Sequence, residues 1–452
     1  MKKTDVLIIG GSAAGMVAAM SGKTSWADKS FTLVKKQKEV MVPCGIPYIF
    51  GTLDSSQQNI MPVDNMLSKI GVDTLVNEVV SISKNTKTVT LKDGEQISYN
   101  KLVIATGSTP VKPKWLKGTE LDHVFVIPKD RAYLDEMKNQ ISELKKVVVV
   151  GAGFIGVEFS DELKKQGHDV TLIEKETSIL YSAFDEEIAS RIAEILESRG
   201  VKIITGNGIR EVVGDSKVQG VKLENGDLLH ADAVILSMGY EPNTKLAEDS
   251  GIYVDESGFI AVDEYMRTHE KDVFAIGDCA QKRDFITRKR ISTMLASTAC
   301  AEARVAGMNL FNIHVVKTFS GTIGIYSTAI GEYGFGTAGI TESRAKEEDV
   351  SVVTGFFEGI DHHPGNLPGT HKQQVKLIVA KYSGVIVGGE VIGGTSAGEL
   401  TNVIGLAIQN RMSVNSLLIS QIGTHPCLTA SPAGYPLIKA AEIIAAKMKN
   451  PK

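Results

Sequence analysis

The sequence contains few cysteines, and they lack the spacings that hold metals or disulfide frameworks. Four cysteines are scattered over 452 residues, without a CxxC pair or a cluster of cysteine and histidine at metal-ligand spacing. We therefore expect neither a metal site nor a structural disulfide framework. Cysteines that are not paired in disulfides are typical of a reducing compartment, so we expect a cytoplasmic protein.

Long apolar runs and an excess of charge are also lacking. No apolar run reaches the roughly 18 to 20 residues that cross a bilayer. The net charge of -4 comes from 49 basic and 53 acidic residues. These charges are interspersed, so they form neither a basic surface for nucleic acid nor a polybasic membrane patch. We expect neither nucleic acid nor a membrane as a partner, and the length predicts two or three domains.

Glycine, in contrast, is abundant, and one glycine-rich motif stands near the N-terminus. Residues 4–9, TDVLII, predict a buried parallel strand, and GGSAAGMVAAM predicts a turn into a helix. We expect Gly10 to make the turn and Gly15 to let the helix pack on the strand, with Ser12 and Ala14 beside a pyrophosphate. Because Ser12 replaces the middle glycine of the dinucleotide fingerprint, this motif alone fits either a dinucleotide site or an ordinary glycine-rich turn.

The second predicted strand departs from the dinucleotide-binding pattern. A carboxylate normally ends this strand and holds the ribose hydroxyls. Here the sequence is LVKKQKEV, with Lys35 where the acid is expected and Glu39 beyond the predicted strand. Lys35 or a backbone group contacts the ribose, or the adenosine end is held differently.

A complete fingerprint recurs in KKVVVVGAGFIGVEFSDEL, residues 145–163. Its motif positions are Gly151, Gly153, Ile155 and Gly156. The next strand ends in Glu174, 23 residues after Gly151. A carboxylate there hydrogen-bonds a ribose 2′-OH and repels a 2′-phosphate, so NADH is favoured, although Lys175 weakens the preference over NADPH. Two such units predict two dinucleotides, a flavin and a nicotinamide.

Between these units lies the candidate redox residue, Cys44, in the segment MVPCGIPYIFG, residues 41–51. It stands between Pro43 and Gly45, after a predicted strand and at the predicted start of a helix. The positive end of a helix dipole favours a thiolate, which would make Cys44 reactive. The alternative is a small buried hydrophobic residue.

Three further segments complete a family pattern. KLVIATGS carries Thr106 and Gly107, SMGYEPN carries Gly239, and DVFAIGDC carries Asp278. With both fingerprints and Cys44, the chain resembles the FAD-dependent pyridine nucleotide-disulfide oxidoreductases. The resemblance implies that Asp278 bonds the ribitol or flavin-proximal region of FAD, and that SMGYEPN links the NAD lobe back to the FAD lobe.

The resemblance also implies an architecture. The fold class is α/β, with two Rossmann-like dinucleotide-binding domains and a C-terminal α+β dimerisation domain, as in glutathione reductase-like proteins. The expected domains are residues 1–112 with 243–318 for FAD, 113–242 for NAD(H), and 319–452 for the dimer interface. A homodimer with shared active sites follows from the same resemblance.

The family pattern further narrows the chemistry. Members with an internal disulfide carry CxxxxC, but Ile49 stands five residues after Cys44. PCGIPY, which includes Pro43, is similar to the single-cysteine branch of coenzyme A disulfide reductases, CoA-dependent sulfur and persulfide reductases, NADH oxidases and NADH peroxidases. Cys44 would then alternate between a thiolate and a mixed disulfide with CoA or a sulfenic acid.

We therefore expect hydride to pass from NAD(P)H through FAD to Cys44, which reduces CoA disulfide, CoA persulfide or polysulfide. An NADH oxidase that reduces oxygen is the nearest alternative, and a redox-gated interaction module is an alternative from another class. CoA needs cations for its phosphates. The lysines near the cysteine segment are Lys23, Lys35, Lys36 and Lys38. Such a run is also typical of a solvated face.

The C-terminal third offers further candidates in GTHPCLTASPAGYP, residues 423–436. His425 resembles the histidine of the family HP motif, but Ala430 replaces the glutamate that would pair with it. Cys427 is either a resolving thiol near the partner's Cys44 or, as we favour, a packed thiol. Tyr435 and Tyr326 are candidate proton donors to a leaving CoA thiolate. We assign Cys279 and Cys300 to packing, and the histidine-rich stretch 361–373 to a surface loop without metal.

Overall fold

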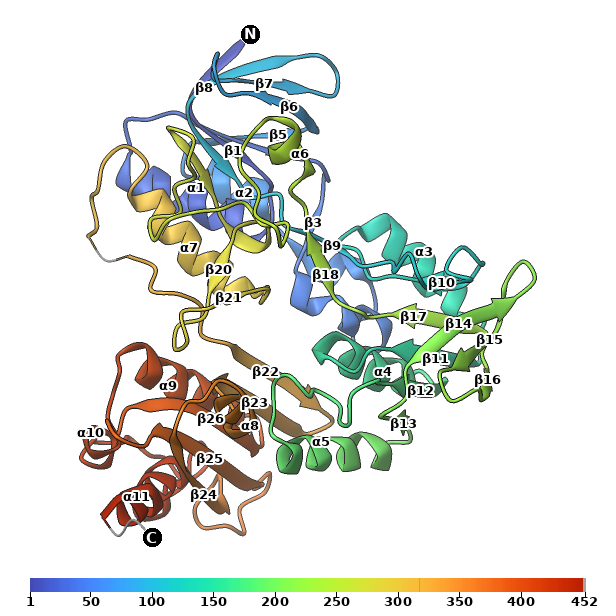
Figure 1. Ribbon diagram of the computed structural model, residues 1–452, viewed down its shortest axis with the longest axis vertical. Coiled ribbons are helices and arrows are strands. Elements are labelled where there is room, and N and C mark those ends of the chain that lie inside the picture. The colour runs from blue at the N-terminus through green and yellow to red at the C-terminus, as the bar shows by residue number, and fades with distance from the viewer. Residues whose placement is uncertain (317, 450–452) are drawn as a thin grey trace.

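The protein, described here from a computed structural model, has three lobes, each built around its own sheet (Figure 1). The structure describes residues 1–316 and 318–449. The predicted fold class, two α/β units followed by an α+β domain, is confirmed. Within the described residues, no helix combines the length and the apolar character needed to cross a membrane.

The N-terminal lobe contains a seven-stranded sheet with β1 (Lys2–Ile9) near its centre. β1 is the strand predicted from TDVLII, and it pairs in parallel with β2 (Phe31–Lys35) and β8 (Gln96–Ile104). The other strands of this sheet are β5 (Val72–Val76), β6 (Val79–Ser83), β7 (Thr88–Leu91) and β19 (Val273–Ala275). β8 precedes the second lobe in the chain and β19 follows it. Because these two strands pair, the sheet contains residues from before and after the second lobe.

Two helices rich in small residues pack together in this lobe. A Cβ atom at Gly307 of α7 (Ala296–Met308) would lie 2.8 Å from the Gly22 nitrogen of α1 (Ala13–Ser25). The small residues thus let the two helix backbones approach closely.

The remaining elements of the lobe are β3 (Val40–Met41), β4 (Ile60–Met61), α2 (Val63–Ser68), α6 (Lys245–Asp249), β20 (Lys282–Arg283) and β21 (Arg290–Ile291).

A five-stranded parallel sheet organises the second lobe. Its central strand, β11 (Lys146–Val150), is a run of valines buried on both faces, as expected for a parallel sheet. Its other strands are β10 (Val124–Phe125), β12 (Asp169–Ile173), β13 (Lys202–Ile204) and β17 (Ala233–Leu236). Three antiparallel strands, β14 (Ile209–Gly214), β15 (Val218–Leu223) and β16 (Leu228–His230), form a separate sheet.

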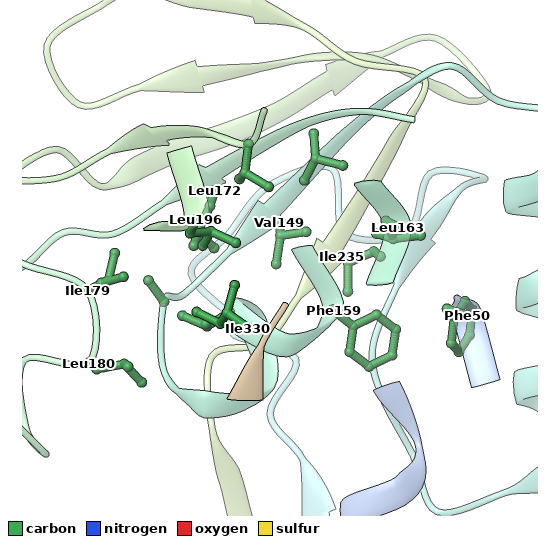
Figure 2. Close-up of a cluster of buried hydrophobic side chains, with 14 of the residues drawn as sticks. Phe50, Val149, Phe159, Leu163, Leu172, Ile179, Leu180, Leu196, Ile235 and Ile330 are labelled. Carbon is green, nitrogen blue, oxygen red and sulfur yellow. The ribbon is translucent and has the colours of Figure 1, made fainter. Parts of the chain in front are cut away.

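The helices of the second lobe are α3 (Arg131–Ser142), α4 (Phe154–Lys165) and α5 (Glu186–Ser198). Side chains from α4 and the sheet form one buried cluster, which also receives Phe50 from the N-terminal lobe (Figure 2). Two connecting strands, β9 (Ser108–Pro110) and β18 (Tyr240–Pro242), pair antiparallel where the chain enters and leaves the second lobe. The predicted domain limits, 1–112 with 243–318 for FAD and 113–242 for NAD(H), stay a prediction. The pairing of β9 with β18, and of β8 with β19, supports them.

The third lobe contains a five-stranded antiparallel sheet. Its strands are β22 (Ile325–Ile330), β23 (Tyr333–Gly339), β24 (Val352–Ile360), β25 (Lys372–Ala380) and β26 (Ile386–Gly393). Its helices are α8 (Glu342–Glu347), α9 (Ala397–Gln409), α10 (Val414–Leu418) and α11 (Pro436–Lys449). The last three residues of the predicted domain 319–452 lie outside the described residues.

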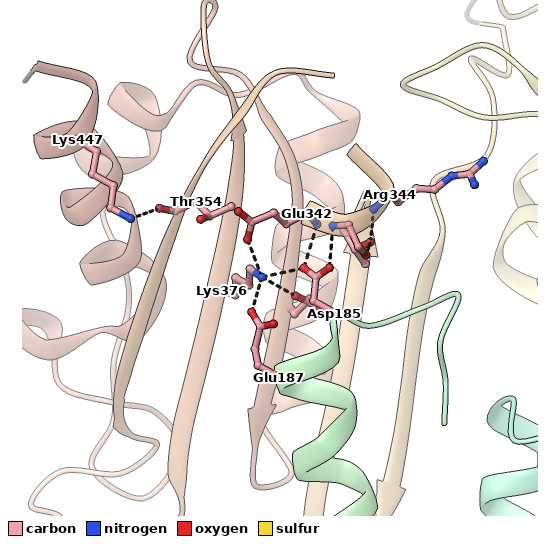
Figure 3. Close-up of polar contacts among 10 residues, drawn as sticks. Asp185, Glu187, Glu342, Arg344, Thr354, Lys376 and Lys447 are labelled. Atoms are coloured by element: carbon pink, nitrogen blue, oxygen red, sulfur yellow. Dashed lines mark hydrogen bonds and ion pairs between the residues drawn. The ribbon is translucent and has the colours of Figure 1, made fainter. Parts of the chain in front are cut away.

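Lys376 joins the second and third lobes (Figure 3). Its buried ammonium lies 2.8 Å from the Asp185 carboxylate, 2.5 Å from that of Glu187 and 2.9 Å from that of Glu342. These three carboxylates lie close enough together to hold a metal ion, but the Lys376 ammonium already pairs with all three. Burial opposes the charge of Lys376, but the hydrogen bonds that its ammonium donates to these carboxylates raise its pKa above the ordinary value. The contact fixes α5 against β25 and the start of α8.

Candidate functional site

The first glycine motif forms a tight turn between β1 and α1. Gly10 has φ +116°, and a Cβ atom there would lie 2.0 Å from the Ala105 carbonyl oxygen. A Cβ atom at Gly15 would lie 1.9 Å from the Gly10 carbonyl oxygen. Ser12 is the N-cap of α1 and its side chain makes no capping bond, while Ala14 lies in the first turn. The backbone N–H groups at this helix start suit a pyrophosphate.

The segments around Thr106 and Asp278 lie beside this turn. The Thr106 hydroxyl donates to the Asn243 carbonyl at 2.6 Å, which ties KLVIATGS to SMGYEPN. Gly107 and Gly239 have φ +72° and +93°, and a Cβ atom at either would meet no protein atom within 4 Å. The Asp278 carboxylate accepts from Ser108 at 2.7 Å. The uncovered backbone at Gly107 and Gly239, beside the side chains of Thr106 and Asp278, leaves room that fits a bound FAD.

Lys35 ends β2, as predicted, but its ammonium already has partners. It donates to the Lys38 carbonyl at 2.5 Å and to the Asp64 carboxylate at 3.0 Å. The aliphatic part of Lys35 lies against Gly11, where a Cβ atom would be 2.7 Å away. Two of the three N–H donors of the ammonium are thus used within the protein, and the role of Lys35 toward FAD stays a prediction.

Two of the three remaining lysines named for CoA, Lys23 and Lys36, also have partners nearby. Lys23 donates to the Ala27 and Lys29 carbonyls at 2.9 and 2.7 Å, and Lys36 pairs with Glu78 at 2.9 Å. Glu39 lies beyond β2, as expected, and pairs with Arg131 at 2.5 Å. The lysine run is therefore occupied largely by protein contacts, and it gives little support to a CoA phosphate site.

The second motif repeats the same construction before α4. Gly151 has φ +95°, and a Cβ atom at Gly156 would lie 1.9 Å from the Gly151 carbonyl oxygen. At Gly153, by contrast, a Cβ atom would meet nothing within 4 Å. Ile155 packs against the buried cluster of Figure 2. The motif therefore has a tight base and an open face, which fits a dinucleotide.

Glu174 follows β12 and lies at the second motif. Its carboxylate accepts from the Ala152 backbone N–H at 2.7 Å and from the Glu176 N–H at 3.0 Å. The acid thus stands directly beside the glycine turn that would hold the pyrophosphate. This placement supports its expected contact with the ribose of NADH.

Cys44 lies on a short arm between the first two lobes. The arm consists of two 3-10 helices, Pro43–Gly45 and Pro47–Phe50, each with a proline in its first turn. Gly45 packs on Asn59, whose amide donates to the Val42 carbonyl at 3.0 Å. The prediction that Cys44 starts a helix with a useful dipole is wrong, because a single three-residue turn has almost none.

The arm is anchored on α4 of the second lobe. The Phe50 ring lies 4.8 Å from the Phe159 ring, between ring centroids. The Thr52 hydroxyl donates to the Glu162 carboxylate at 2.8 Å. Ile49, which stands in place of a second redox cysteine, is completely buried in this contact. Cys44 itself is exposed, so one thiol is presented at the junction of the two nucleotide lobes.

The charges around Cys44 do not favour its thiolate. The side chain is exposed, but the surrounding protein desolvates the sulfur enough to raise the pKa of Cys44, and the Glu158 carboxylate raises it further. The Lys129 ammonium acts in the opposite direction. The expected activation of Cys44 by the protein alone is therefore contradicted.

Three residues at this junction were not predicted. Glu158 is half-buried on α4, and the desolvation of its carboxyl by the surrounding protein raises its pKa to about 7. Lys129 donates to the Asp278 carboxylate at 3.0 Å and to the Ser108 hydroxyl at 3.1 Å. Burial and the charge of Glu158 raise the pKa of Tyr48. Glu158 stands seven residues after Gly151 on the motif helix, but nothing in the sequence marks its proximity to Cys44.

His425 and Cys427 lie together on an exposed segment, where the Cys427 backbone N–H donates to the His425 ring at 3.2 Å. Because Cys427 is exposed, the packed thiol favoured from the sequence is not found within the single chain. Of the predicted loop 361–373, residues 361–371 lie outside helices and strands, while the last two residues belong to β25. His363 in this loop bonds to the Thr429 and Pro426 carbonyls and so supports the segment that carries His425. Ala430 is buried.

The two candidate tyrosines lie in different places. Tyr326 stacks on Phe154 at the start of α4, with centroids 4.9 Å apart and planes 9° from parallel. Tyr435 packs against the core of the third lobe, and burial raises the pKa of both hydroxyls. Cys279 is buried and Cys300 half-buried, which agrees with packing roles.

Comparisons with known proteins identify the family of this chain. The family model described as pyridine nucleotide-disulphide oxidoreductase matches residues 4–303, and its dimerisation domain matches residues 325–433. An NADH oxidase of Methanocaldococcus jannaschii is 30% identical over 98% of this chain and 99% of its own. A CoA-dependent NAD(P)H sulfur oxidoreductase of Pyrococcus abyssi is 32% identical over 87% of this chain and 88% of its own.

Solved structures give the same picture. A NAD-dependent persulfide reductase from A. fulgidus superimposes with a TM-score of 0.90 and 29% identity, covering 99% of this chain and 84% of that one. A water-forming NADH oxidase from Lactobacillus brevis, bound to NADH, superimposes with a TM-score of 0.89 and 25% identity, covering 99% of both chains.

Proposed function

Because the chain belongs to the pyridine nucleotide-disulphide oxidoreductase family, whose members use FAD and NAD(P)H, we propose that it reduces a low-molecular-weight disulfide, persulfide or polysulfide through Cys44. The observation that carries this proposal is the exposed thiol of Cys44, held at the junction of two nucleotide-binding lobes. With Ile49 buried where a second thiol would stand, the partner sulfur comes from the substrate.

We assign the two glycine motifs to the two cofactors. The residues proposed for FAD are Gly10, Ser12, Ala14, Gly15, Lys35, Pro43, Thr106, Gly107, Gly239 and Asp278. Those proposed for NADH are Gly151, Gly153, Ile155, Gly156 and Glu174, and NADPH is the alternative donor. Bound FAD supplies a two-electron carrier that takes hydride from the nicotinamide. The protein supplies the helix starts that bind both pyrophosphates.

The proposed thiol chemistry has two steps, a thiol–disulfide exchange and a reduction. The Cys44 thiolate attacks one sulfur of the substrate, so a bond from Cys44 to sulfur forms, the substrate S–S bond breaks, and a thiolate leaves. Two electrons and one proton return Cys44 to the thiolate and release the second thiol. Lys129 favours the thiolate by its charge, and Glu158 opposes it when ionised. The ionisation of Glu158 therefore adjusts how readily Cys44 attacks.

The proposal of CoA as the thiol carrier rests on the relatives. The Pyrococcus protein is named a CoA-dependent sulfur oxidoreductase, and another relative, from Pyrococcus horikoshii, a coenzyme A polysulfide/persulfide reductase. Reducing the purified protein without oxygen and identifying by mass what leaves Cys44 tests this point. Release of CoA supports the proposal, while an unmodified or sulfenic Cys44 favours oxygen chemistry.

Reduction of oxygen by an NADH oxidase is the second candidate. The relative from Methanocaldococcus jannaschii and the structure from Lactobacillus brevis favour it. Turnover of NADH with CoA disulfide, polysulfide or oxygen as sole acceptor separates the two. The redox-gated interaction module is tested by the same assay, since it requires slow turnover with every acceptor.

We also propose that a second copy completes the site. The dimerisation-domain match fits a homodimer. Ile419 and Leu428, on either side of His425, are exposed apolar residues that a partner would cover. In this arrangement His425, Cys427 and Tyr435 of one protomer serve the Cys44 site of the other. A cytoplasmic setting is part of the same proposal, and the four free thiols are compatible with it.

A further inference from the structure

A buried ion pair lies behind the Asp278 turn. Lys282 on β20 and Glu302 on α7 both have side chains that are 0% exposed, and the Lys282 ammonium lies 3.5 Å from Glu302 Oε1. Such a pair is costly, because each ion loses its hydration, and well-packed apolar residues in its place are often as stable or more so. The pair is therefore poorly explained by a contribution to stability alone.

The hydrogen bonds of this pair converge on one residue. The Gly277 backbone N–H donates to Glu302 Oε2 at 2.8 Å, and the Gly277 carbonyl accepts from the Lys282 ammonium at 2.5 Å. The ammonium also donates to the Ala280 carbonyl at 2.9 Å. The carboxylate and the ammonium thus hold both polar groups of Gly277, and with them the turn Gly277–Cys279.

This turn connects the start of α1 with Asp278. Gly277 has φ +72°, and a Cβ atom there would lie 2.9 Å from the Ala14 Cβ atom. The next residue, Asp278, accepts from Ser108 and Lys129 at the open edge of the lobe. The charge of Lys282 helps to lower the pKa of Asp278. A shift of the turn would therefore move Asp278 relative to the helix start that faces the pyrophosphate.

Glu302 also keeps an unused acceptor. Its Oε1 atom is buried and makes no hydrogen bond within the described residues, and burial raises the pKa of the carboxyl. We propose that Lys282 and Glu302 are positioning residues for FAD, which hold the Gly277 peptide so that Asp278 meets the cofactor. The inference rests on the assignment of Asp278 to FAD under the proposed function, and it adds how that residue is held.

The test compares holoenzymes by the rate at which they release FAD. The double variant Lys282→Met/Glu302→Leu replaces both charged side chains with apolar side chains of similar volume. We expect it to release FAD about ten to a hundred times faster than the unaltered protein, the factor that corresponds to one or more lost charge-assisted hydrogen bonds. We also expect a changed visible circular dichroism of the bound flavin, which a loss of stability alone would not cause.

Two further variants make the result decisive. Lys84→Met/Glu270→Leu removes a half-exposed pair of the same lobe, 2.5 Å apart, and is expected to leave FAD release unchanged. Lys282→Met/Glu302→Gln keeps an amide oxygen for the Gly277 N–H, so it is expected to release FAD at an intermediate rate. This variant serves the test if the apolar one fails to fold.

The inference is overturned if either Lys282 variant folds, releases FAD at the unaltered rate and keeps the flavin circular dichroism. Asp278→Ala separates this failure from that of the site assignment. If Asp278→Ala also releases FAD normally, the assignment of Asp278 fails, and the positioning inference fails with it. If Asp278→Ala releases FAD faster and the Lys282 variants do not, only the positioning inference fails.

Discussion

The Thr328 hydroxyl donates a hydrogen bond to the Glu158 carboxylate across 2.8 Å, and so joins β22 of the third lobe to α4 of the second. Burial raises the pKa of Glu158 to about 7, so this carboxyl changes charge near neutral pH. When ionised, it raises the pKa of the Cys44 thiol. The reactivity of the thiol therefore depends on a group that is held by a distant part of the chain.

Replacing Glu158 should make Cys44 more reactive above neutral pH. In Glu158→Gln the negative charge that opposes the thiolate is absent, so the pKa of the Cys44 thiol falls. Alkylation of Cys44 by iodoacetamide as a function of pH measures this shift. Glu197→Gln, an exposed change on α5, should leave the profile where it is. An unchanged or upward-shifted profile in Glu158→Gln would show that Glu158 does not act on the thiol.

The junction formed by Lys376 should respond strongly to substitution. Lys376→Met leaves the buried Asp185 carboxylate without its ammonium, and losing one partner of a buried pair costs about 3 kcal/mol in free energy of unfolding. Lys245→Met removes an exposed partner of Asp249 and should change little. Urea unfolding of both variants checks this prediction, which fails if the two lose equal stability.

The same junction predicts a loss of stability in acid. In the folded protein the pKa of Asp185 is lowered to about 2, with hydrogen bonds from Lys376 and Ser343 among the causes, against an ordinary value of 3.8. A lowered folded-state pKa means that this stabilisation is present above pH 3.8 and is lost as the pH falls toward 2. Unfolding curves from pH 5 to 2 should show Asp185→Asn losing less stability than the unaltered protein. A parallel decline in both proteins would contradict the assignment.

Two glycines of the second motif should behave differently when changed to alanine. At Gly156 a Cβ atom would lie 1.9 Å from the Gly151 carbonyl, so Gly156→Ala should lower the melting temperature. At Gly153, which has φ -71°, a Cβ atom meets no protein atom within 4 Å. Gly153→Ala should therefore fold normally but raise the KM for NADH about tenfold, because the methyl group enters the nucleotide site. Normal NADH kinetics in Gly153→Ala would place the nucleotide elsewhere.

Local sequence predicted the parts of this protein that depend on local chemistry. The turns at Gly10 and Gly151 each follow from a strand, a glycine with positive φ and a helix with a glycine in its first turn, all adjacent in the chain. The conformation of Cys44 was missed because Pro43 and Pro47 each begin a short 3-10 helix, where one longer helix was expected. Each proline fits the first turn of a helix but lacks the N–H needed further along it.

The electrostatics of the site depend on contacts that sequence order does not contain. The partner of Glu158 is 170 residues away, at Thr328, and that of Asp278 is 149 residues away, at Lys129. The position of Lys35 at the end of β2 makes it one candidate for the ribose contact, while its partner Asp64 lies on α2, outside the motif. Such long-range pairs decide charge states, and only the fold brings them together.

The central claim is that Cys44 carries the reaction, and NADH-driven reduction of CoA disulfide and CoA persulfide by Cys44→Ser without oxygen tests it most directly. The account predicts that this variant binds FAD, still takes hydride from NADH, and loses at least about a thousandfold in acceptor turnover, since a serine hydroxyl cannot form the mixed disulfide. Full turnover of both acceptors by Cys44→Ser would contradict it.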